Sequence, residues 1–216
     1  MNYAIGIQQQ GASSPPIYRA ALDKVRSLAL PRGAKIADVG GGGGSFSRLL
    51  VEAGYQVTLF DFTPDVFDGL IDVRSGNLNQ NWDAKDGEFD AIISLEVIEH
   101  VENPRHFMRE ICRIAKPRSP VLISTPNQHS LSSKLCFLFR GEHQHFQESC
   151  YPAHISPLLK CDLLRISREC GFTDPEFSHT GSGRIPGTRL QWQNVLPFSR
   201  GQLFSDNVLF RCNAPS

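Results

Sequence analysis

Five consecutive glycines at residues 40–44 constrain the fold of this chain more than any other feature. The apolar run at residues 34–39 before them is typical of a buried parallel strand. Phe46, Leu49 and Leu50 follow at helical spacing, and Ser45 stands where it can cap that helix. The glycines therefore form a strand-to-helix turn, in which positive φ angles are allowed and a ligand can lie against the backbone. Because the amides at the start of the helix would face that ligand, we expect a nucleotide-like cofactor.

The spacing of the glycines distinguishes between three known kinds of nucleotide-binding motif. A dinucleotide fingerprint G-x-G-x-x-G would need a third glycine where this chain has another residue, and no Gly-Lys-Ser/Thr follows to make a phosphate-binding loop. The pattern D-x-G-x-G-x-G does fit, with Asp38, Gly40, Gly42 and Gly44. In this form the turn resembles the first motif of the class I S-adenosylmethionine (SAM)-dependent methyltransferases.

Length and composition favour a single domain with one sizeable core, since the chain has 216 residues of which 40% are hydrophobic. No apolar run is long enough to cross a bilayer, and residues 1–16 lack the apolar core of a signal peptide. The six cysteines form no C-x-x-C pair, which argues against a zinc ribbon or a redox motif. We expect reduced thiols in a cytoplasmic protein.

The formal net charge is zero, but it is unevenly distributed along the chain. Residues 1–102 carry −6 and residues 103–216 carry +6. This asymmetry is either chance clustering on a solvated surface or a basic C-terminal face for an anionic substrate. A neutral chain gives little support for nucleic acid as the substrate.

An acid follows the glycine turn at the distance where βαβ nucleotide folds bind a ribose. Asp61 ends a strand expected at residues 55–61 and lies 21 residues after Gly40, so it should accept hydrogen bonds from the ribose hydroxyls. Gly41 in the turn and Phe62 beside the acid are further expected cofactor contacts.

Two other cofactor contacts are implied by the resemblance, which is strongest to quinone-biosynthesis O-methyltransferases. Arg19, on a helix expected at residues 18–30 and ended by Pro31, would bind the cofactor's carboxylate; an exposed helix arginine is the alternative. The turn after a strand at residues 70–74 contributes Asn77 and Leu78. The family usually carries an aspartate where Asn77 stands, and an amide oxygen can still accept a bond from adenine, without charge.

A second motif supports the first. Residues 89–101, FDAIISLEVIEHV, resemble the FDxIxxxEVIEHV segment of quinone-biosynthesis and type 11/12 methyltransferases. Because a strand expected at residues 89–94 should end at the ligand crevice, Leu95 and Glu96 are predicted to border the cofactor. Glu99 and His100 either take part in the chemistry or orient the loop and cap a helix.

The same segment leaves a metal as an alternative. Glu96, Glu99 and His100 fall at i, i+3 and i+4 on a helix beginning here. This pattern carries a divalent ion in the small-RNA 2′-O-methyltransferases and in some quinone-biosynthesis methyltransferases, where a downstream histidine may complete the site; the counterpart would be His145 or His154. Many relatives have the same residues at these positions and bind no metal, so we assign no residue as a metal ligand.

The C-terminal half is expected to cover the acceptor. RIAKPRSPVLISTPN resembles the family pattern R-hLKPGG-hhhhohPN, with Arg-Ser-Pro in place of the glycine pair, and holds a strand at residues 121–125. Residues 128–153 lack steady periodicity and are rich in histidine and aromatic residues, which favours a lid over a planar or lipidic acceptor; a partly helical surface insertion is the alternative. A helix from His154 to Gly171 and two strands at 172–179 and 207–211 follow. Between these strands Trp192 would form a second substrate wall.

The resemblance implies one α/β domain with a Rossmann-like class I methyltransferase fold. Its seven-stranded, mostly parallel sheet would have an antiparallel last strand and helices on both faces. We expect an N-terminal arm and helix at 1–31, a SAM-binding core at 32–126, a lid at 127–156, and a C-terminal helix and strand hairpin at 157–216.

The expected activity is methyl transfer from SAM to a small-molecule acceptor, at oxygen. A base is needed only where the nucleophile must lose a proton, and His154, His145 and His100 are the candidates. The alternatives are a SAM-binding protein without turnover, a metal-dependent enzyme similar to the RNA 2′-O-methyltransferases, and a nicotinamide oxidoreductase. The sequence determines neither the acceptor nor the oligomeric state.

Overall fold

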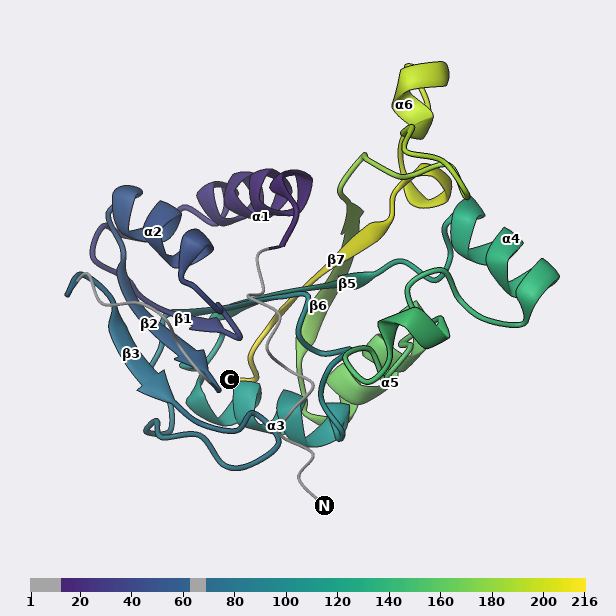
Figure 1. Ribbon diagram of the computed structural model, residues 1–216. Helices are drawn as coiled ribbons and strands as arrows, with labels where there is room; N and C mark the ends of the chain where they lie inside the picture. Colours follow the sequence, from purple (N-terminus) through teal and green to yellow (C-terminus); the bar gives the residue numbers. More distant parts are fainter. Residues whose placement is uncertain (1–12, 63–68) are drawn as a thin grey trace.

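The computed structural model describes residues 13–62 and 69–216 (Figure 1). Most of the expected N-terminal arm therefore lies outside the described residues. Seven strands form one sheet in the order β3-β2-β1-β4-β5-β7-β6. The parallel strands are β1 (Lys35–Val39), β2 (Gln56–Asp61), β3 (Asp72–Ser75), β4 (Ala91–Leu95) and β5 (Pro120–Pro126). β7 (Asn207–Asn213) runs antiparallel to both β5 and β6 (Thr173–His179), which confirms the predicted mixed sheet.

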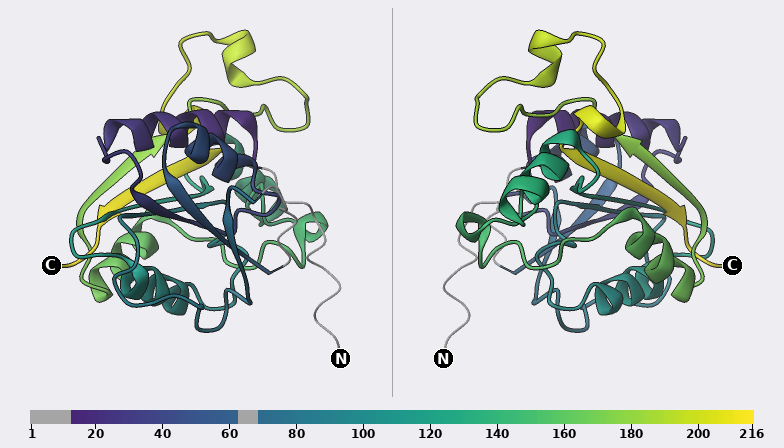
Figure 2. Two further views of the ribbon diagram at one scale, coloured as in Figure 1. Left: turned by 90° about the vertical axis from the view of Figure 1, so that its left-hand side faces the viewer. Right: turned by 90° about the vertical axis from the view of Figure 1, so that its right-hand side faces the viewer.

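Helices cover both faces of the sheet (Figures 1 and 2). α1 (Pro15–Ser27) and α2 (Ser45–Glu52) lie on one face, and α3 (Pro104–Ile114) and α5 (Lys160–Glu169) lie on the other. Successive strand residues point to opposite faces, so Ile36 belongs to the apolar cluster that includes α1 and α2, and Ala37 to the cluster that includes α3 and α5. Burial on both faces explains why these strands are apolar throughout rather than alternating.

Several helix boundaries differ from the prediction, and α1 ends at Ser27 rather than at residue 30. α1 begins at Pro15, three residues early, because proline suits the first helical turn, where no amide partner is needed. Ser45 was expected to cap α2 and does not. Gly44 is the N-cap with φ 72°, and no side chain caps the helix. The chain leaves the glycine turn in a left-handed conformation, so Ser45 is already the first helical residue.

The expected irregular segment contains a helix, α4 (Leu131–Arg140). Only Ser132 and Ser133 of α4 are buried, while Leu138 and Phe139 face solvent. An apolar stripe therefore does not mark its inner face, and periodicity fails to predict it. The following helix was placed too early, because α5 begins at Lys160 after an extended stretch.

Short helical segments complete the C-terminal part: a 3-10 turn at Glu148–Cys150, α6 (Trp192–Val195) and a 3-10 turn, η3 (Gln202–Phe204). Within residues 13–62 and 69–216, none of the helices combines the length and apolar character needed to cross a bilayer. The carboxyl ends of the parallel strands share one edge of the sheet, and in open α/β sheets ligands bind at that edge.

Candidate cofactor and acceptor site

The glycine turn is tightly packed below and open above. A Cβ added to Gly40, whose φ is +77°, would lie 2.3 Å from Val97 Cγ2, and one added to Gly41 would lie 2.7 Å from Asp38 Oδ2. Only glycine fits at these two positions. A Cβ on Gly43 would meet nothing within 4 Å. The outer side of the turn can therefore receive a ligand against the backbone.

Asp61 stands beside this turn, as the spacing predicts. Its Oδ2 accepts a hydrogen bond of 2.8 Å from the backbone amide of Gly42, and the next residue, Phe62, is exposed. This contact brings the end of β2 to the outer side of the β1–α2 turn. The arrangement fits a cofactor whose ribose hydroxyls bind the carboxylate while its body lies on the glycines.

Asp38 lies beneath the turn rather than on its open side. It is buried, and its Oδ2 accepts a hydrogen bond of 2.6 Å from Ser47 Oγ on α2. Burial raises the pKa of Asp38 to about 6, which the Ser47 bond opposes and the nearby charge of Asp61 reinforces. The contacts of Asp38 in this structure tie β1 to α2.

The residues expected to contact the adenine and the carboxylate of the cofactor, Asn77, Leu78 and Arg19, make other contacts in this structure. Asn77 is exposed, and its Oδ1 accepts a bond of 2.9 Å from the amide of Asn79, so its amide oxygen already closes a turn. Leu78 is half-buried beside it. Arg19 lines a separate pocket of about 360 Å³ formed by α1 and residues near Thr180. Nothing in these contacts tests the roles expected for Asn77, Leu78 and Arg19.

At the end of β4 the chain makes a strained turn at Glu96, whose φ is +57°. Glu96 Oε1 accepts a bond of 2.6 Å from Ser124 Oγ, and Oε2 accepts one of 2.6 Å from Asn207 Nδ2. Burial raises the pKa of Glu96 to about 7, against the effect of these two bonds. Glu96 thus joins β4, β5 and β7, while Leu95 beside it is buried. No sequence pattern predicts the role of Asn207, which is 111 residues away.

Three of the sequence-predicted residues form one cluster next to Glu96. Glu99, His100 and His154 each offer a ligand atom, and these atoms all lie within 4.8 Å of one another. Glu99 is fully buried; its Oε2 accepts a bond from Thr125 Oγ1, and its Oε1 has no partner among the described residues. Burial and the neighbouring Glu96 raise the pKa of Glu99 well above its usual range. An unpartnered buried carboxylate oxygen beside two imidazoles is a donor set that fits a divalent cation.

The hydrogen bonds of the histidines fix where their protons lie. His154 Nδ1 is 2.6 Å from the carbonyl oxygen of His145, and His100 Nδ1 is 2.7 Å from that of Ala153. A carbonyl only accepts, so each Nδ1 carries a proton. In a neutral His154 ring this leaves the lone pair at Nε2, where it can take a proton or bind a metal. The His100 ring lies edge-on to it, with the centroids 4.7 Å apart, and burial lowers the pKa of His100.

His145 occupies a different position from the other two base candidates. Its ring is buried, its Nε2 has no partner within the described part of the chain, and burial lowers its pKa to about 4. Its backbone carbonyl orients His154. His145 therefore lies behind His154 rather than in the three-residue cluster.

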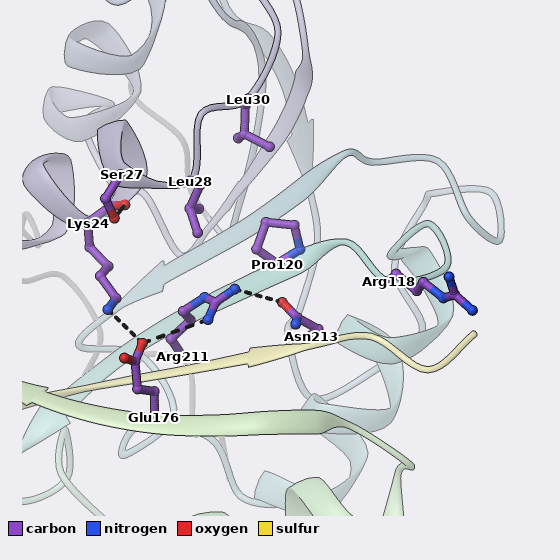
Figure 3. A pocket seen from close by; sticks show the side chains of 9 residues that line it. All are labelled: Lys24, Ser27, Leu28, Leu30, Arg118, Pro120, Glu176, Arg211 and Asn213. Carbon is purple, nitrogen blue, oxygen red and sulfur yellow. Dashed lines mark hydrogen bonds and ion pairs between the residues drawn. The ribbon is translucent and has the colours of Figure 1, made fainter.

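A pocket of about 480 Å³ lies away from this cluster (Figure 3). It is lined by Pro120 at the start of β5, by α1 and by β6 and β7, which places it opposite the carboxyl ends of the parallel strands. Lys24 and Arg211 share Glu176 as an ion-pair partner, at 2.7 and 3.8 Å. These ion pairs have a structural role. The candidate site lies elsewhere, at the carboxyl ends of the parallel strands.

Comparison with known proteins gives consistent results. The sequence model of a methyltransferase domain family matches residues 16–174. A ubiquinone biosynthesis O-methyltransferase of Xanthomonas oryzae pv. oryzae is 30% identical over 169 residues, covering 69% of this chain and 70% of that protein. One from Xanthomonas axonopodis pv. citri is 28% identical over the same length and the same shares.

Solved structures share the fold at lower identity. A SAM-dependent methyltransferase from Archaeoglobus fulgidus superposes with a TM-score of 0.61 at 18% identity, over 91% of this chain and 94% of its own. Phosphoethanolamine N-methyltransferase 2 of Haemonchus contortus, in complex with SAM, gives a TM-score of 0.63 at 16% identity, over 92% of this chain and 53% of its own. Sheet order, glycine turn and family match agree: this chain belongs to the class I SAM-dependent methyltransferases, and SAM is its cofactor.

Proposed function

We propose that this enzyme transfers the methyl group of SAM to a hydroxyl oxygen of a small-molecule acceptor. The observation that carries the proposal is the cluster of Glu99, His100 and His154, which a hydrogen bond from Thr125 to Glu99 holds near the carboxyl end of β5. The relatives named as ubiquinone biosynthesis O-methyltransferases support oxygen as the accepting atom.

The cofactor would be held by the glycine turn and Asp61. SAM supplies an electrophilic methyl group on its sulfonium when bound. Asp61 would accept hydrogen bonds from the ribose hydroxyls, and the open backbone at Gly43 would receive the rest of the molecule. Leu95 and the backbone of Glu96 would border it at the end of β4, while the Glu96 side chain stays engaged with Ser124 and Asn207.

His154 is the best-placed base among the three histidines. Its Nε2 lone pair would take the acceptor's hydroxyl proton as the oxygen bonds to the methyl group, while the His145 carbonyl holds the ring in the productive tautomer. The Phe146 ring, 5.4 Å from that of His154, would help to exclude water.

A divalent cation is a second candidate for the same task. Glu99 Oε1, His100 and His154 would be its ligands, and a bound ion would lower the pKa of the acceptor hydroxyl. Glu96 does not join this set, because both its oxygens already accept hydrogen bonds. Base and metal make opposite predictions for a chelated enzyme.

The test combines binding and turnover. Calorimetry should show binding of SAM and its demethylated product but not of NAD, and labelled SAM with a metabolite extract should give a methylated product identified by mass spectrometry. Binding without any methylated product would favour the non-catalytic alternative. Activity that survives exhaustive chelation, with no metal in the purified protein, would leave His154 as the base; activity lost on chelation and restored by one cation would establish the metal.

A further inference from the structure

The pocket of about 480 Å³ in Figure 3 lies at the opposite edge of the sheet from the proposed cofactor and acceptor sites. Its volume is within the range of small-molecule sites. Three cationic residues and one acid line it: Lys24, Arg118, Arg211 and Glu176. The lining therefore carries a net charge of +2, although the whole chain is neutral. A concave surface with excess positive charge attracts anions.

The cations at one end of the pocket are only partly neutralised by the protein. Lys24 Nζ on α1 is 2.7 Å from Glu176 Oε2, and Arg211 Nη1 on β7 is 3.8 Å from the same oxygen, beyond hydrogen-bond distance. Arg211 donates from Nη2 to Asn213 Oδ1 at 3.1 Å, and its Nε has no partner within residues 13–62 and 69–216. One carboxylate thus serves two cations, and Arg211 retains N–H donors for a further acceptor.

Arg118 stands apart from this group, at the other end of the pocket (Figure 3). Its φ is +62°, a left-handed conformation that glycine adopts freely and that costs free energy in a residue with a Cβ. The resembled family pattern has the first glycine of its KPGG segment where this chain has Arg118. The backbone amide of Arg118 donates to the carbonyl of Pro215 at 3.1 Å, a bond that glycine would make equally well. The fold alone therefore favours glycine at this position.

The side chain at this strained position has no structural partner. Arg118 is exposed, and its guanidinium forms neither an ion pair nor a hydrogen bond with the described part of the chain. A strained backbone that the fold does not require indicates a function for the side chain. The planar guanidinium suits phosphate and carboxylate groups, because it can donate two parallel hydrogen bonds to either.

We propose that this pocket binds a small metabolite with two or more phosphate or carboxylate groups, one held by Lys24 and Arg211 and another by Arg118. The apolar part of the lining, formed by Leu28, Leu30 and Pro120, would contact the body of the ligand. The site goes beyond the proposed methyl transfer and does not rest on it, because it shares no residue with the glycine turn or the cluster of Glu99, His100 and His154.

The experiment is calorimetry on the full chain at low ionic strength, with inorganic phosphate, tripolyphosphate and citrate as probes. Tripolyphosphate or citrate should bind one per chain and about tenfold more tightly than inorganic phosphate, because only the larger anions present several charged groups to the two ends of the pocket. The tighter of the two identifies phosphate or carboxylate as the preferred group. High salt should weaken binding, and saturating SAM should leave it unchanged.

Variants locate the site. Arg118→Gly should weaken polyanion binding about tenfold while the melting temperature stays the same or rises, since glycine relieves the strained backbone. Ala29→Gly is the matched control: Ala29 is also exposed and has a φ of 50°, but it carries no charge and does not line the pocket, so binding should not change. Lys24→Gln should weaken binding about tenfold, and Glu176→Gln should strengthen it about threefold.

Three outcomes overturn the proposal. The first is that none of the probes binds at millimolar concentration. The second is that Arg118→Gly and Ala29→Gly bind the polyanions as the parent does, which would show unspecific attraction to surface charge. The third is competition between the polyanions and SAM, which would place the probes in the cofactor site instead. Loss of methyl transfer activity has no bearing on any of these measurements.

Discussion

The proposed cofactor side, formed by the glycine turn and Asp61, and the proposed acceptor side, formed by Glu96, Glu99, His100 and His154, are built in different ways. The cofactor side is a turn between consecutive elements, in which Gly40 fits under Val97 and the Gly42 amide binds Asp61 nearby in sequence. The acceptor side joins side chains from distant strands and loops: Glu96 meets Asn207, and His100 meets His154. Backbone geometry dominates the first region, and buried ionisable side chains dominate the second.

This difference separates what each region should lose on mutation. Changes on the cofactor side should lower SAM affinity or stability, because the backbone there both stabilises the fold and forms the binding surface for SAM. Changes in the cluster of Glu99, His100 and His154 should lower turnover while SAM still binds. A variant of the cluster that lost SAM affinity, or a variant of the glycine turn that lost only turnover, would contradict this division.

The largest effect is expected on the acceptor side. His154→Ala should lower kcat by about 10²- to 10⁴-fold, the range for loss of a general acid or base, with SAM affinity unchanged by calorimetry. His106→Ala on α3 is the control and should leave kcat unaltered. If SAM affinity fell together with kcat, His154 would belong to the cofactor side and the division between the two regions would be wrong.

Gly40→Ala should give the next largest effect. The added Cβ would lie 2.3 Å from Val97 Cγ2 at a φ of +77°, so the turn must shift. We expect a loss of about 3 kcal/mol in the free energy of unfolding, from overpacking and backbone strain, together with loss of SAM binding. Gly43→Ala is the matched control, because its Cβ meets nothing within 4 Å, and denaturation with calorimetry measures both variants. Equal behaviour of the two variants would contradict the packing seen beneath the turn.

The two regions also differ in how far the sequence predicts them. The glycine turn and the position of Asp61 beside it follow from local spacing, and the structure has both. The mixed seven-stranded sheet, which the family resemblance implied, is also present. The prediction that Ser45 caps α2 was wrong, because the chain leaves the turn in a left-handed conformation at Gly44, which is the N-cap, and Ser45 is the first helical residue. Local spacing predicts Asp61 beside the turn because the Gly42–Asp61 contact is made within one βαβ unit, whereas the packing of Gly40 against Val97 has no local signal.

The acceptor side resists prediction because its contacts have no local signature. Nothing near Glu96 indicates that its carboxylate is held by Ser124 and Asn207, 28 and 111 residues away. The spacing of Glu96, Glu99 and His100 predicted one helical face, but residues 96–101 form turns, and the next helix, α3, begins only at Pro104 with Asn103 as its N-cap. The helix α4 agrees with the alternative of a partly helical surface insertion at residues 128–153, but periodicity did not locate it because its apolar side chains face solvent instead of the core.

The pH dependence of the free energy of unfolding tests whether Asp38 stabilises the packing beneath the glycine turn or contacts the cofactor. Its folded pKa of about 6 lies above the ordinary value near 4, so the folded state holds the proton longer than the unfolded state. Its contribution therefore decreases stability as pH rises from about 4 to 6, by roughly 3 kcal/mol, and is constant above that range. Urea denaturation of Asp38→Asn should show a stability that declines less than the parent's across this window.

The difference between the two curves isolates Asp38, because the raised pKa values of Glu96 and Glu99 act equally in parent and variant. If stability fell equally with pH in the parent and in Asp38→Asn, burial would not raise the pKa of Asp38. An altered pH slope with unchanged SAM affinity would assign Asp38 to the packing beneath the turn; a large loss of affinity would place it among the cofactor contacts.

The smallest of these effects, and the sharpest for the cofactor side, concerns Asp61. Its Oδ2 already accepts the Gly42 amide at 2.8 Å, so the carboxylate both shapes the turn and is available to a ribose. Asp61→Ala should weaken SAM binding by about 1.5–3 kcal/mol, the range for a hydrogen bond to a charged group. Asp61→Asn separates the two roles, because an amide oxygen can still accept from Gly42 while the charge is lost. If ribose binding dominates, calorimetry should show both variants weakened and their melting temperatures close to the parent's. If shaping the turn dominates, Asp61→Asn should bind SAM nearly as the parent does, and only Asp61→Ala should lose affinity. Unchanged affinity in both variants would remove the ribose assignment and leave the glycine backbone as the main cofactor contact on this side of the sheet.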